Sequence, residues 1–246
     1  MNIFIFTTGL NCWNTEIMNS LIKERNITIK GIYISKPQGG DNGLYKKVQR
    51  LLKYGFDNLL RISFQKYFNN NSGKNKTALK EYHKLIEETP IYTGDSFNHC
   101  LSLANDSNYI SILVYFNRII PKKYVLKGEM INIHPSYLPY YKGVQPVFWA
   151  LLNNETEIGV TIHKVDVGID TGAIYEQYKL PILSNSINEV MTMISDKITI
   201  NLPLLLNRIN KKEVIPKKQK EVKGGYYSRP TSSDIRLFFR GGKRYY

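Results

Sequence analysis

The sequence predicts an α/β fold with a Rossmann-like, mostly parallel sheet. Its first part alternates an apolar strand at 2–6, an amphipathic helix at 12–23 and a second strand at 27–34, and this β-α-β order is typical of parallel sheets. Two further apolar runs, at 109–115 and 130–133, have the length and composition of buried strands. Ligands of such sheets bind at the carboxyl ends of the strands, so we expect functional residues in the loops that follow these runs.

Composition narrows the class of protein. The 246 residues include 34 Lys and Arg against 20 Asp and Glu, which gives a net charge of +14. This charge indicates an anionic partner, whether nucleic acid, an anionic membrane or a small polyanion, without choosing among them. Two cysteines cannot form a disulfide scaffold, and the first residues do not resemble a signal sequence, so we expect a cytoplasmic protein without a transmembrane segment.

The second half of the chain continues the pattern and ends in a basic tail. We expect a main domain at 1–206 and a short basic C-terminal extension at 207–246. The expected elements are strands at 159–165 and 173–180, a helix at 187–206 that Pro203 can kink, and a short helix from about 232 to 239 capped by Thr231 or Ser232.

A basic insert at about 41–88 interrupts the sheet pattern. Between Leu44 and Phe68, apolar residues recur mostly at helical spacing, with Lys and Arg between them. One interpretation is a helix that packs on the sheet and exposes a basic face. The other is a helix that binds an anionic membrane surface or a partner groove.

Asn132 and His134 stand two residues apart at the end of a strand and enter a loop with two prolines, 135–143. Side chains two apart on a strand point the same way, so this pair projects from a rigid base. An amide can donate a hydrogen bond to a developing oxyanion, and an imidazole can transfer a proton near neutral pH. The alternative is a histidine that only satisfies backbone groups of the loop.

Two carboxylates, Asp166 and Asp170, lie in a Gly-containing loop between two expected strands. A carboxylate beside an imidazole would orient it and raise its basicity. The alternatives are a simple turn or a metal site formed with His163. We interpret Cys100 beside His99 as an ordinary helix pair, because sequence neighbours on a helix do not face each other.

Taken together, these motifs resemble the family of formyltransferases that use 10-formyltetrahydrofolate. They are the loop at 132–143, the strand that ends in Thr161-Ile162-His163 and the loop at 169–174, in the family's order and spacing. The segment 116–121 also resembles the one whose backbone holds the pterin ring. The resemblance implies the formyltransferase fold and 10-formyltetrahydrofolate as co-substrate, with no metal.

The resemblance also implies roles for single residues. Asn132 would hold the formyl oxygen, His134 would stabilise the tetrahedral intermediate and relay a proton, and Asp170 would orient or assist His134. The expected folate-binding residues are Phe116, Arg118, Ile119, Ile120, Asp166 and Gly168, with Asp166 shaping the loop rather than acting in catalysis. The expected acceptor contacts are Thr8, Lys142 and Gln145.

Three branches of this family differ in the amine that they formylate. The glycinamide ribonucleotide branch has a glycine-rich phosphate loop after the first strand, and the segment 7–12 lacks the repeated glycines. The methionyl-tRNA branch adds a complete C-terminal domain, for which the 40 residues after Leu206 are too few. We therefore expect no nucleic acid partner.

The third branch formylates nucleotide-linked amino sugars for surface polysaccharide (O-antigen) synthesis. The compact domain, the helical insert and the tail Tyr226-Tyr227-Ser228-Arg229-Pro230-Thr231 resemble it. We expect a dTDP- or UDP-linked 4-amino-4,6-dideoxyhexose as acceptor, and a homodimer. An alternative of another class is a non-catalytic binding module that keeps the fold.

Overall fold

The computed structural model describes residues 1–9, 11–35, 62, 89–104, 108–125, 128–222 and 225–246. Apart from residue 62, the basic insert expected at 41–88, including the helix expected at 44–68, lies outside the described residues.

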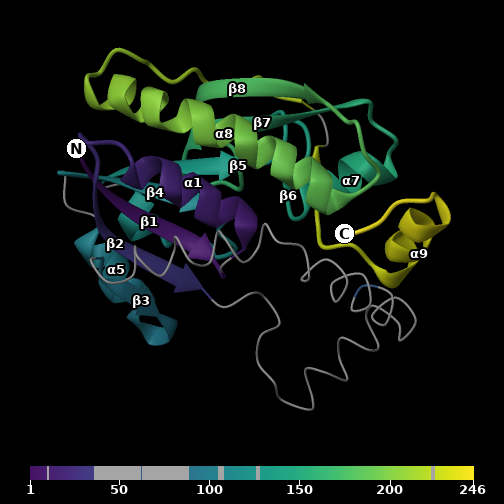
Figure 1. The fold of residues 1–246 in the computed structure, drawn as a ribbon, viewed down its shortest axis with the longest axis horizontal. Coiled ribbons are helices and arrows are strands. Elements are labelled where there is room, and N and C mark those ends of the chain that lie inside the picture. Colours follow the sequence, from purple (N-terminus) through teal and green to yellow (C-terminus); the bar gives the residue numbers. More distant parts are fainter. Residues whose placement is uncertain (10, 36–61, 63–88, 105–107, 126–127, 223–224) are drawn as a thin grey trace.

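A seven-stranded sheet forms the centre of the fold, in the order β3-β2-β1-β4-β5-β7-β8 (Figure 1). All pairs from β3 to β5 are parallel, whereas β7 pairs antiparallel with both β5 and β8. The strands are β1 (Asn2–Thr8), β2 (Thr28–Ser35), β3 (Ile91–Thr93), β4 (Tyr109–Val114), β5 (Glu129–His134), β7 (Glu157–Lys164) and β8 (Ile174–Pro181). The expected α/β class and mostly parallel sheet are confirmed.

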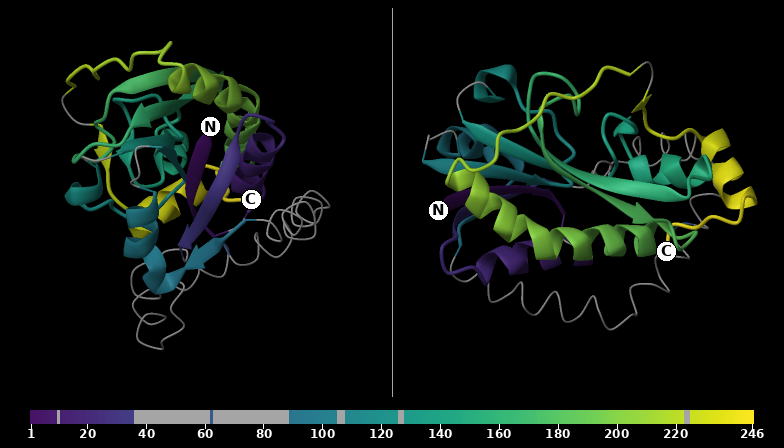
Figure 2. Two further views of the ribbon diagram at one scale, coloured as in Figure 1. Left: turned by 90° about the vertical axis from the view of Figure 1, so that its left-hand side faces the viewer. Right: turned by 90° about the horizontal axis from the view of Figure 1, so that it is seen from above.

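Alternate side chains of β1 build two cores, one on each face of the sheet, because successive strand residues point to opposite sides. Ile3 and Ile5 are fully buried under the long helices α1 (Cys12–Ile22) and α8 (Ile187–Asn210), which pack against each other. Figure 2 shows both helices on the same face. Phe4 and Phe6 belong to the other core, an aromatic cluster that includes α5 (Phe97–Leu103).

The helix starts follow local sequence. Asn11 caps α1 with a capping box, and Ser186 accepts the Glu189 N–H at the start of α8. Pro203 lies inside α8, which continues to Asn210 and so runs across the domain boundary predicted at residue 206. No helix among the described residues is long and apolar enough to cross a membrane.

The residues after α8 return to the main core rather than forming a separate unit. A two-stranded parallel ladder joins β6 (Lys142–Gly143) to β9 (Tyr226–Tyr227). The ring of Phe238 stacks on that of Phe148 with centroids 4.5 Å apart. The remaining elements are η1 (Gly94–Ser96), α6 (Lys122–Val125), α7 (Pro146–Leu152) and α9 (Ser232–Arg240). Thr231 caps the N-terminus of α9, as expected.

Candidate active site

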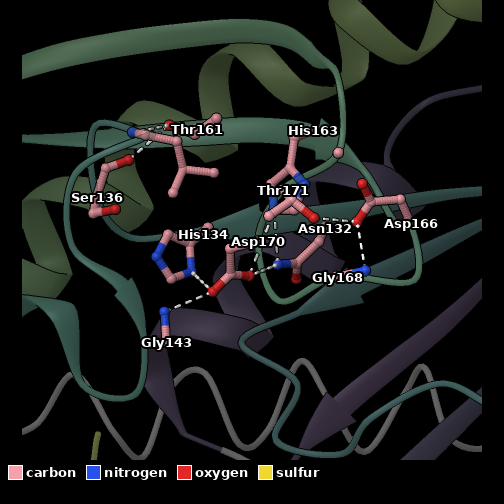
Figure 3. Close-up of polar contacts among 12 residues, drawn as sticks. Asn132, His134, Ser136, Gly143, Thr161, His163, Asp166, Gly168, Asp170 and Thr171 are labelled. Atoms are coloured by element: carbon pink, nitrogen blue, oxygen red, sulfur yellow. Dashed lines mark hydrogen bonds and ion pairs between the residues drawn. The ribbon is translucent and has the colours of Figure 1, made fainter. Parts of the chain in front are cut away.

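The β5–β7 pair brings the polar motifs of the sequence together. The antiparallel register sets Asn132 opposite His163 and His134 opposite Thr161. The turn that joins β7 to β8 returns Asp170 to the same place, where it meets Asn132 and His134 (Figure 3). The structure therefore gathers the three residues expected to act in catalysis, although they are up to 38 positions apart in the sequence.

The loop after β5 is fixed by the hydroxyl of Thr161, which is fully buried. This hydroxyl donates to the carbonyl of Ser136 at 2.7 Å and accepts from the backbone N–H of Leu138 at 3.1 Å. The amide of Gln177 donates to the same hydroxyl at 2.9 Å and to the Leu138 carbonyl at 2.8 Å. Gly159 lies beneath the loop, where an added Cβ would come within 2.6 Å of the Tyr137 Cβ. The loop therefore has little freedom to move.

His134 is 5% exposed, and each of its ring nitrogens lies near one polar group. Nε2 lies 2.9 Å from the carbonyl oxygen of Tyr141, an acceptor, so Nε2 carries the proton. Nδ1 lies 3.6 Å from Oδ2 of Asp170. In the neutral ring, Nδ1 is then the nitrogen without a proton, and it faces the Asp170 carboxylate.

Asp170 joins the groups of the cluster from the side opposite β5. Its Oδ2 accepts the backbone N–H of Gly143 at 2.8 Å, and its Oδ1 lies 3.4 Å from Nδ2 of Asn132 and 3.7 Å from Nε2 of His163. Its backbone is left-handed, with φ of 52°. Gly143 also has a positive φ, 94°, and an added Cβ would come within 2.3 Å of the Tyr227 carbonyl oxygen, so this contact requires glycine.

His163 acts as the acceptor that orients Asn132. Nδ1 of His163 donates to its neighbour's carbonyl, that of Lys164, at 2.7 Å, so the bare Nε2 accepts from Nδ2 of Asn132 at 3.1 Å. Burial, followed by repulsion from His134, lowers the pKa of His163 to about 4. The ring is therefore neutral near pH 7. No group of three His, Cys, Asp or Glu side chains among the described residues could hold a metal ion, so the alternative of a site at His163, Asp166 and Asp170 is not supported.

The residues expected to bind folate divide into loop-forming, buried and exposed groups. Oδ1 of Asp166 accepts from the N–H of Gly168 at 3.1 Å and from the hydroxyl of Thr171 at 2.7 Å, so Asp166 closes the turn that carries Asp170. Val167 and Ile169, in the same turn, are 65% and 46% exposed.

The segment after β4 is anchored in the aromatic core. Phe116 contacts that core, and Ile120 is buried in it. The guanidinium of Arg118 lies 3.9 Å from the ring centroid of Phe97 and donates to the hydroxyl of Tyr33 at 2.6 Å. Ile119 is 80% exposed. Ile119 is therefore the apolar side chain of this segment that is most open to solvent.

The expected acceptor contacts lie at different places. The hydroxyl of Thr8 accepts the backbone N–H of Asn117 and shares a hydrogen bond with Ser35, so it ties three strand ends together. Lys142 lies in β6, where its backbone N–H donates to Gly225. Gln145 is exposed, and its left-handed backbone precedes α7.

Sequence reasoning missed five contributors to the cluster: the backbone of Tyr141, the N–H of Gly143, the hydroxyl of Thr161, the acceptor nitrogen of His163, and the amide of Gln219, which donates to the Asp170 carbonyl at 2.9 Å. The first four lie inside the motifs that carried the resemblance, so their positions were marked but not their roles. Gln219 lies in the basic tail, and no pattern in the sequence marks it.

Comparison with known proteins agrees with this geometry. Residues 100–202 match the protein family described as formyl transferase. A methionyl-tRNA formyltransferase from Synechococcus sp. (strain JA-3-3Ab) is 33% identical over 131 residues, which are 52% of this chain and 41% of that protein. The chain thus aligns with less than half the length of this curated relative.

Two solved structures share the fold over nearly the whole chain. A sugar N-formyltransferase from Shewanella sp. FDAARGOS_354 has a TM-score of 0.60 and 17% identity, covering 98% of this chain and 87% of that one. An N-formyltransferase from Helicobacter canadensis, in complex with folinic acid and dTDP-3-aminofucose, has a TM-score of 0.60 and 22% identity, covering 98% and 80%. These likenesses confirm the fold expected from the sequence.

Proposed function

We propose that this chain transfers a formyl group from 10-formyltetrahydrofolate to the amine of a nucleotide-linked amino sugar, because residues 100–202 match the formyl transferase family. The observation that carries the transfer chemistry is that Asn132 and His134 each lie within hydrogen-bond or ion-pair distance of the Asp170 carboxylate. When bound, the folate supplies the formyl group, and the residues of this chain position it and manage charge and protons.

Asn132 provides the hydrogen bond to the oxygen on which charge develops. One N–H of its amide is held by the neutral Nε2 of His163 at 3.1 Å, which fixes the plane of the amide. The other points to Asp170 at 3.4 Å, a long and therefore weak hydrogen bond. This second N–H is the donor that the site can redirect to a substrate oxygen at low cost.

His134 accepts the proton that the attacking amine must lose and passes it on to the folate nitrogen as the bond between that nitrogen and the formyl carbon breaks, so tetrahydrofolate leaves with its proton. The Nε2 proton of His134 is held by the Tyr141 carbonyl, so Nδ1 takes up the new proton. The resulting imidazolium faces the Asp170 carboxylate 3.6 Å away, and this attraction stabilises the charged ring. Asp170 itself is fixed by the N–H of Gly143, so it supports His134 in a constant position.

The surroundings fit a flat, anionic folate. Ile119, Val167 and Ile169 are exposed apolar side chains on the loops after β4 and β7, and such side chains can contact the faces of a pterin ring. The net charge of +14 favours both the glutamate of folate and the diphosphate of a nucleotide sugar.

For the acceptor, support comes from the sugar N-formyltransferases of Shewanella and Helicobacter, which share the fold over 98% of the chain. A dTDP- or UDP-linked 4-amino-4,6-dideoxyhexose is the acceptor that we propose, within surface polysaccharide synthesis. The homodimer and the cytoplasmic location remain predictions from the sequence.

A second candidate acceptor is the charged initiator tRNA. It is favoured by the 33% identity to the Synechococcus methionyl-tRNA formyltransferase, which exceeds the identity to either sugar enzyme. The basic surface implied by the net charge would suit this acceptor as well.

Release of tetrahydrofolate, followed by absorbance, separates these candidates. The purified chain is given 10-formyltetrahydrofolate with a panel of dTDP- and UDP-amino sugars, glycinamide ribonucleotide or methionyl-tRNA, and His134→Ala serves as the blank. We expect release with an amino sugar nucleotide. Release with only tRNA or glycinamide ribonucleotide would overturn the sugar assignment, and no release with any acceptor would favour a binding module.

A further inference from the structure

We propose that Gln219 is a positioning residue for formyl transfer, because it locks the backbone of the turn that presents Asp170 to His134. This inference rests on the proposed function for its consequence on the rate. Its structural part, the control of the Asp170 turn by a residue 49 positions away, can be tested without any substrate.

The turn that carries Asp170 needs an outside support. Val167, Gly168, Ile169 and Thr171 are all exposed, so the turn has no core of its own. Asp170 itself has a φ of 52°, a left-handed conformation that a non-glycine residue keeps only where its surroundings enforce it.

The side-chain amide of Gln219 supplies this support by binding two backbone carbonyls of the turn. Nε2 donates to the carbonyl of Asp170 at 2.9 Å and to the carbonyl of Gly172 at 2.8 Å. With the amide turned the other way, its oxygen would face two carbonyl oxygens, so only this orientation is favourable. Oε1 is left buried without a hydrogen-bond partner, which shows that the two donor bonds determine how the side chain lies.

Gln219 is itself held in place by the sheet. Two residues before it, Lys217 forms an antiparallel bridge with Ile174, the first residue of β8, through backbone bonds of 2.7 and 2.8 Å. Gln219 is partly buried, whereas its neighbours Lys218 and Lys220 are exposed. The basic tail therefore contributes one inward polar side chain, and that side chain meets the catalytic turn.

The position of the Asp170 carboxylate depends on how the turn is held, because its contacts go to groups in different directions. Oδ2 must reach the N–H of Gly143 at 2.8 Å while it stays 3.6 Å from Nδ1 of His134. A small rotation of the backbone at Asp170 would break one of these contacts. Displacements of this kind cost rate rather than binding, because the reacting groups lose their alignment.

The test uses Gln219→Met, which keeps the length of the side chain and removes both donors without adding charge. We expect kcat to fall on the order of 10- to 100-fold, while KM for the amine acceptor changes less than about twofold. Gln219→Glu should lose at least as much, since a carboxylate would face two carbonyls. Lys218→Gln, a substitution of the neighbouring exposed residue that removes one positive charge and so lowers the net charge by one as Gln219→Glu does, is the matched control and should keep the wild-type rate.

Amide hydrogen exchange provides a readout that is independent of turnover. The N–H of Gly143 is protected by Oδ2 of Asp170, so Gln219→Met should raise its exchange rate about tenfold, as expected for the loss of one hydrogen bond. The N–H of Leu138, which is held by Thr161, should be unaffected. Unchanged exchange at Gly143, or a rise in KM with unchanged kcat, overturns the proposal. If the wild type releases no tetrahydrofolate, the proposed function fails, and the Gly143 result still decides the role of Gln219.

Discussion

The cluster has a strand side, formed by Asn132 and His134, and a turn side, formed by Asp170, whose carboxylate lies between those two side chains (Figure 3). The two sides are supported by different kinds of structure. Asn132 and His134 belong to β5, whose backbone is paired on both sides within the sheet. Asp170 lies in an exposed turn that is held from outside by Gly143 and Gln219. The first side is held by the pairing of strands in the sheet. The second is held by the bonds of Asp166 within the turn together with contacts from Gly143 and Gln219, which are distant in the sequence.

This difference has a functional meaning. In the reaction that we propose, the β5 side carries the hydrogen-bond donor and the proton acceptor, which must be placed before the substrates arrive. The turn also carries Val167 and Ile169, exposed side chains that we propose to contact folate. A turn supported by a few contacts can adjust to a ligand, whereas the strand cannot. Variants on the two sides should therefore fail in different ways.

The largest effect is expected on the β5 side, at Asn132. Asn132→Ala removes the donor to the developing oxyanion, so kcat should fall on the order of 10²–10³-fold. The rate is measured by tetrahydrofolate release under saturating substrates.

Asn26→Ala is the matched control. The Asn26 amide is exposed, and among the described residues its Nδ2 donates one hydrogen bond, to Oδ1 of Asn207. This variant should keep the wild-type rate. Near-normal turnover of Asn132→Ala would show that the oxyanion donor lies elsewhere and would remove the main argument for the proposed chemistry.

The next effect concerns the stability of the loop on the same side. Thr161→Val keeps the shape of the side chain but leaves the Leu138 N–H and the Ser136 carbonyl without their buried partner. Each such loss costs about 1–3 kcal/mol, so the free energy of unfolding should fall by about 3 kcal/mol in urea titrations.

Thr199→Val makes the same chemical change at a hydroxyl that is buried without a partner. It should leave the stability equal or slightly higher, since no hydrogen bond is lost. Equal losses in the two variants would mean that the hydroxyl of Thr161 does not hold the loop.

Much of this architecture could be predicted from the sequence because its signals are local. The alternation around β1, α1 and β2 predicted those elements to within one or two residues, and the motif at Asn132 and His134 marked the end of β5. The helix α7 and the ladder between β6 and β9 were not predicted. Two-residue strands carry no periodicity, and the pairing of residue 142 with residue 226 is a property of the whole fold.

The candidate site likewise divides into residues that sequence motifs mark and residues whose role only the structure shows. Asn132, His134 and Asp170 could be named from motifs, but only the structure gives His163 its part as the acceptor for Asn132. A histidine in a strand has no sequence feature that reports its burial or its tautomer. Gln219 was hidden for a related reason: its neighbours in sequence are exposed lysines, and its partners are 47 and 49 positions away.

The smallest effect is a pH dependence that belongs to His163. Burial lowers its pKa in the folded chain to about 4, against an ordinary value of 6.5. Between these two values the unfolded chain binds more protons than the folded one, so the stability contributed by neutral His163 is complete above pH 6.5 and declines as the pH falls toward 4. From pH 7.5 to pH 5.0, this decline amounts to about 2 kcal/mol.

His163→Gln removes the buried ring, so the variant should be less stable than the wild type at pH 7.5. Because glutamine does not titrate, the difference in free energy of unfolding between the two proteins, the gap, should narrow by about 2 kcal/mol at pH 5.0 in urea titrations at the two pH values. His99→Gln, at an exposed histidine, controls for the exchange of residue types. A gap of constant size would mean that His163 is not held neutral by burial. The orientation of Asn132 would then need another cause, and the strand side of the cluster would depend on contacts as fragile as those of the turn.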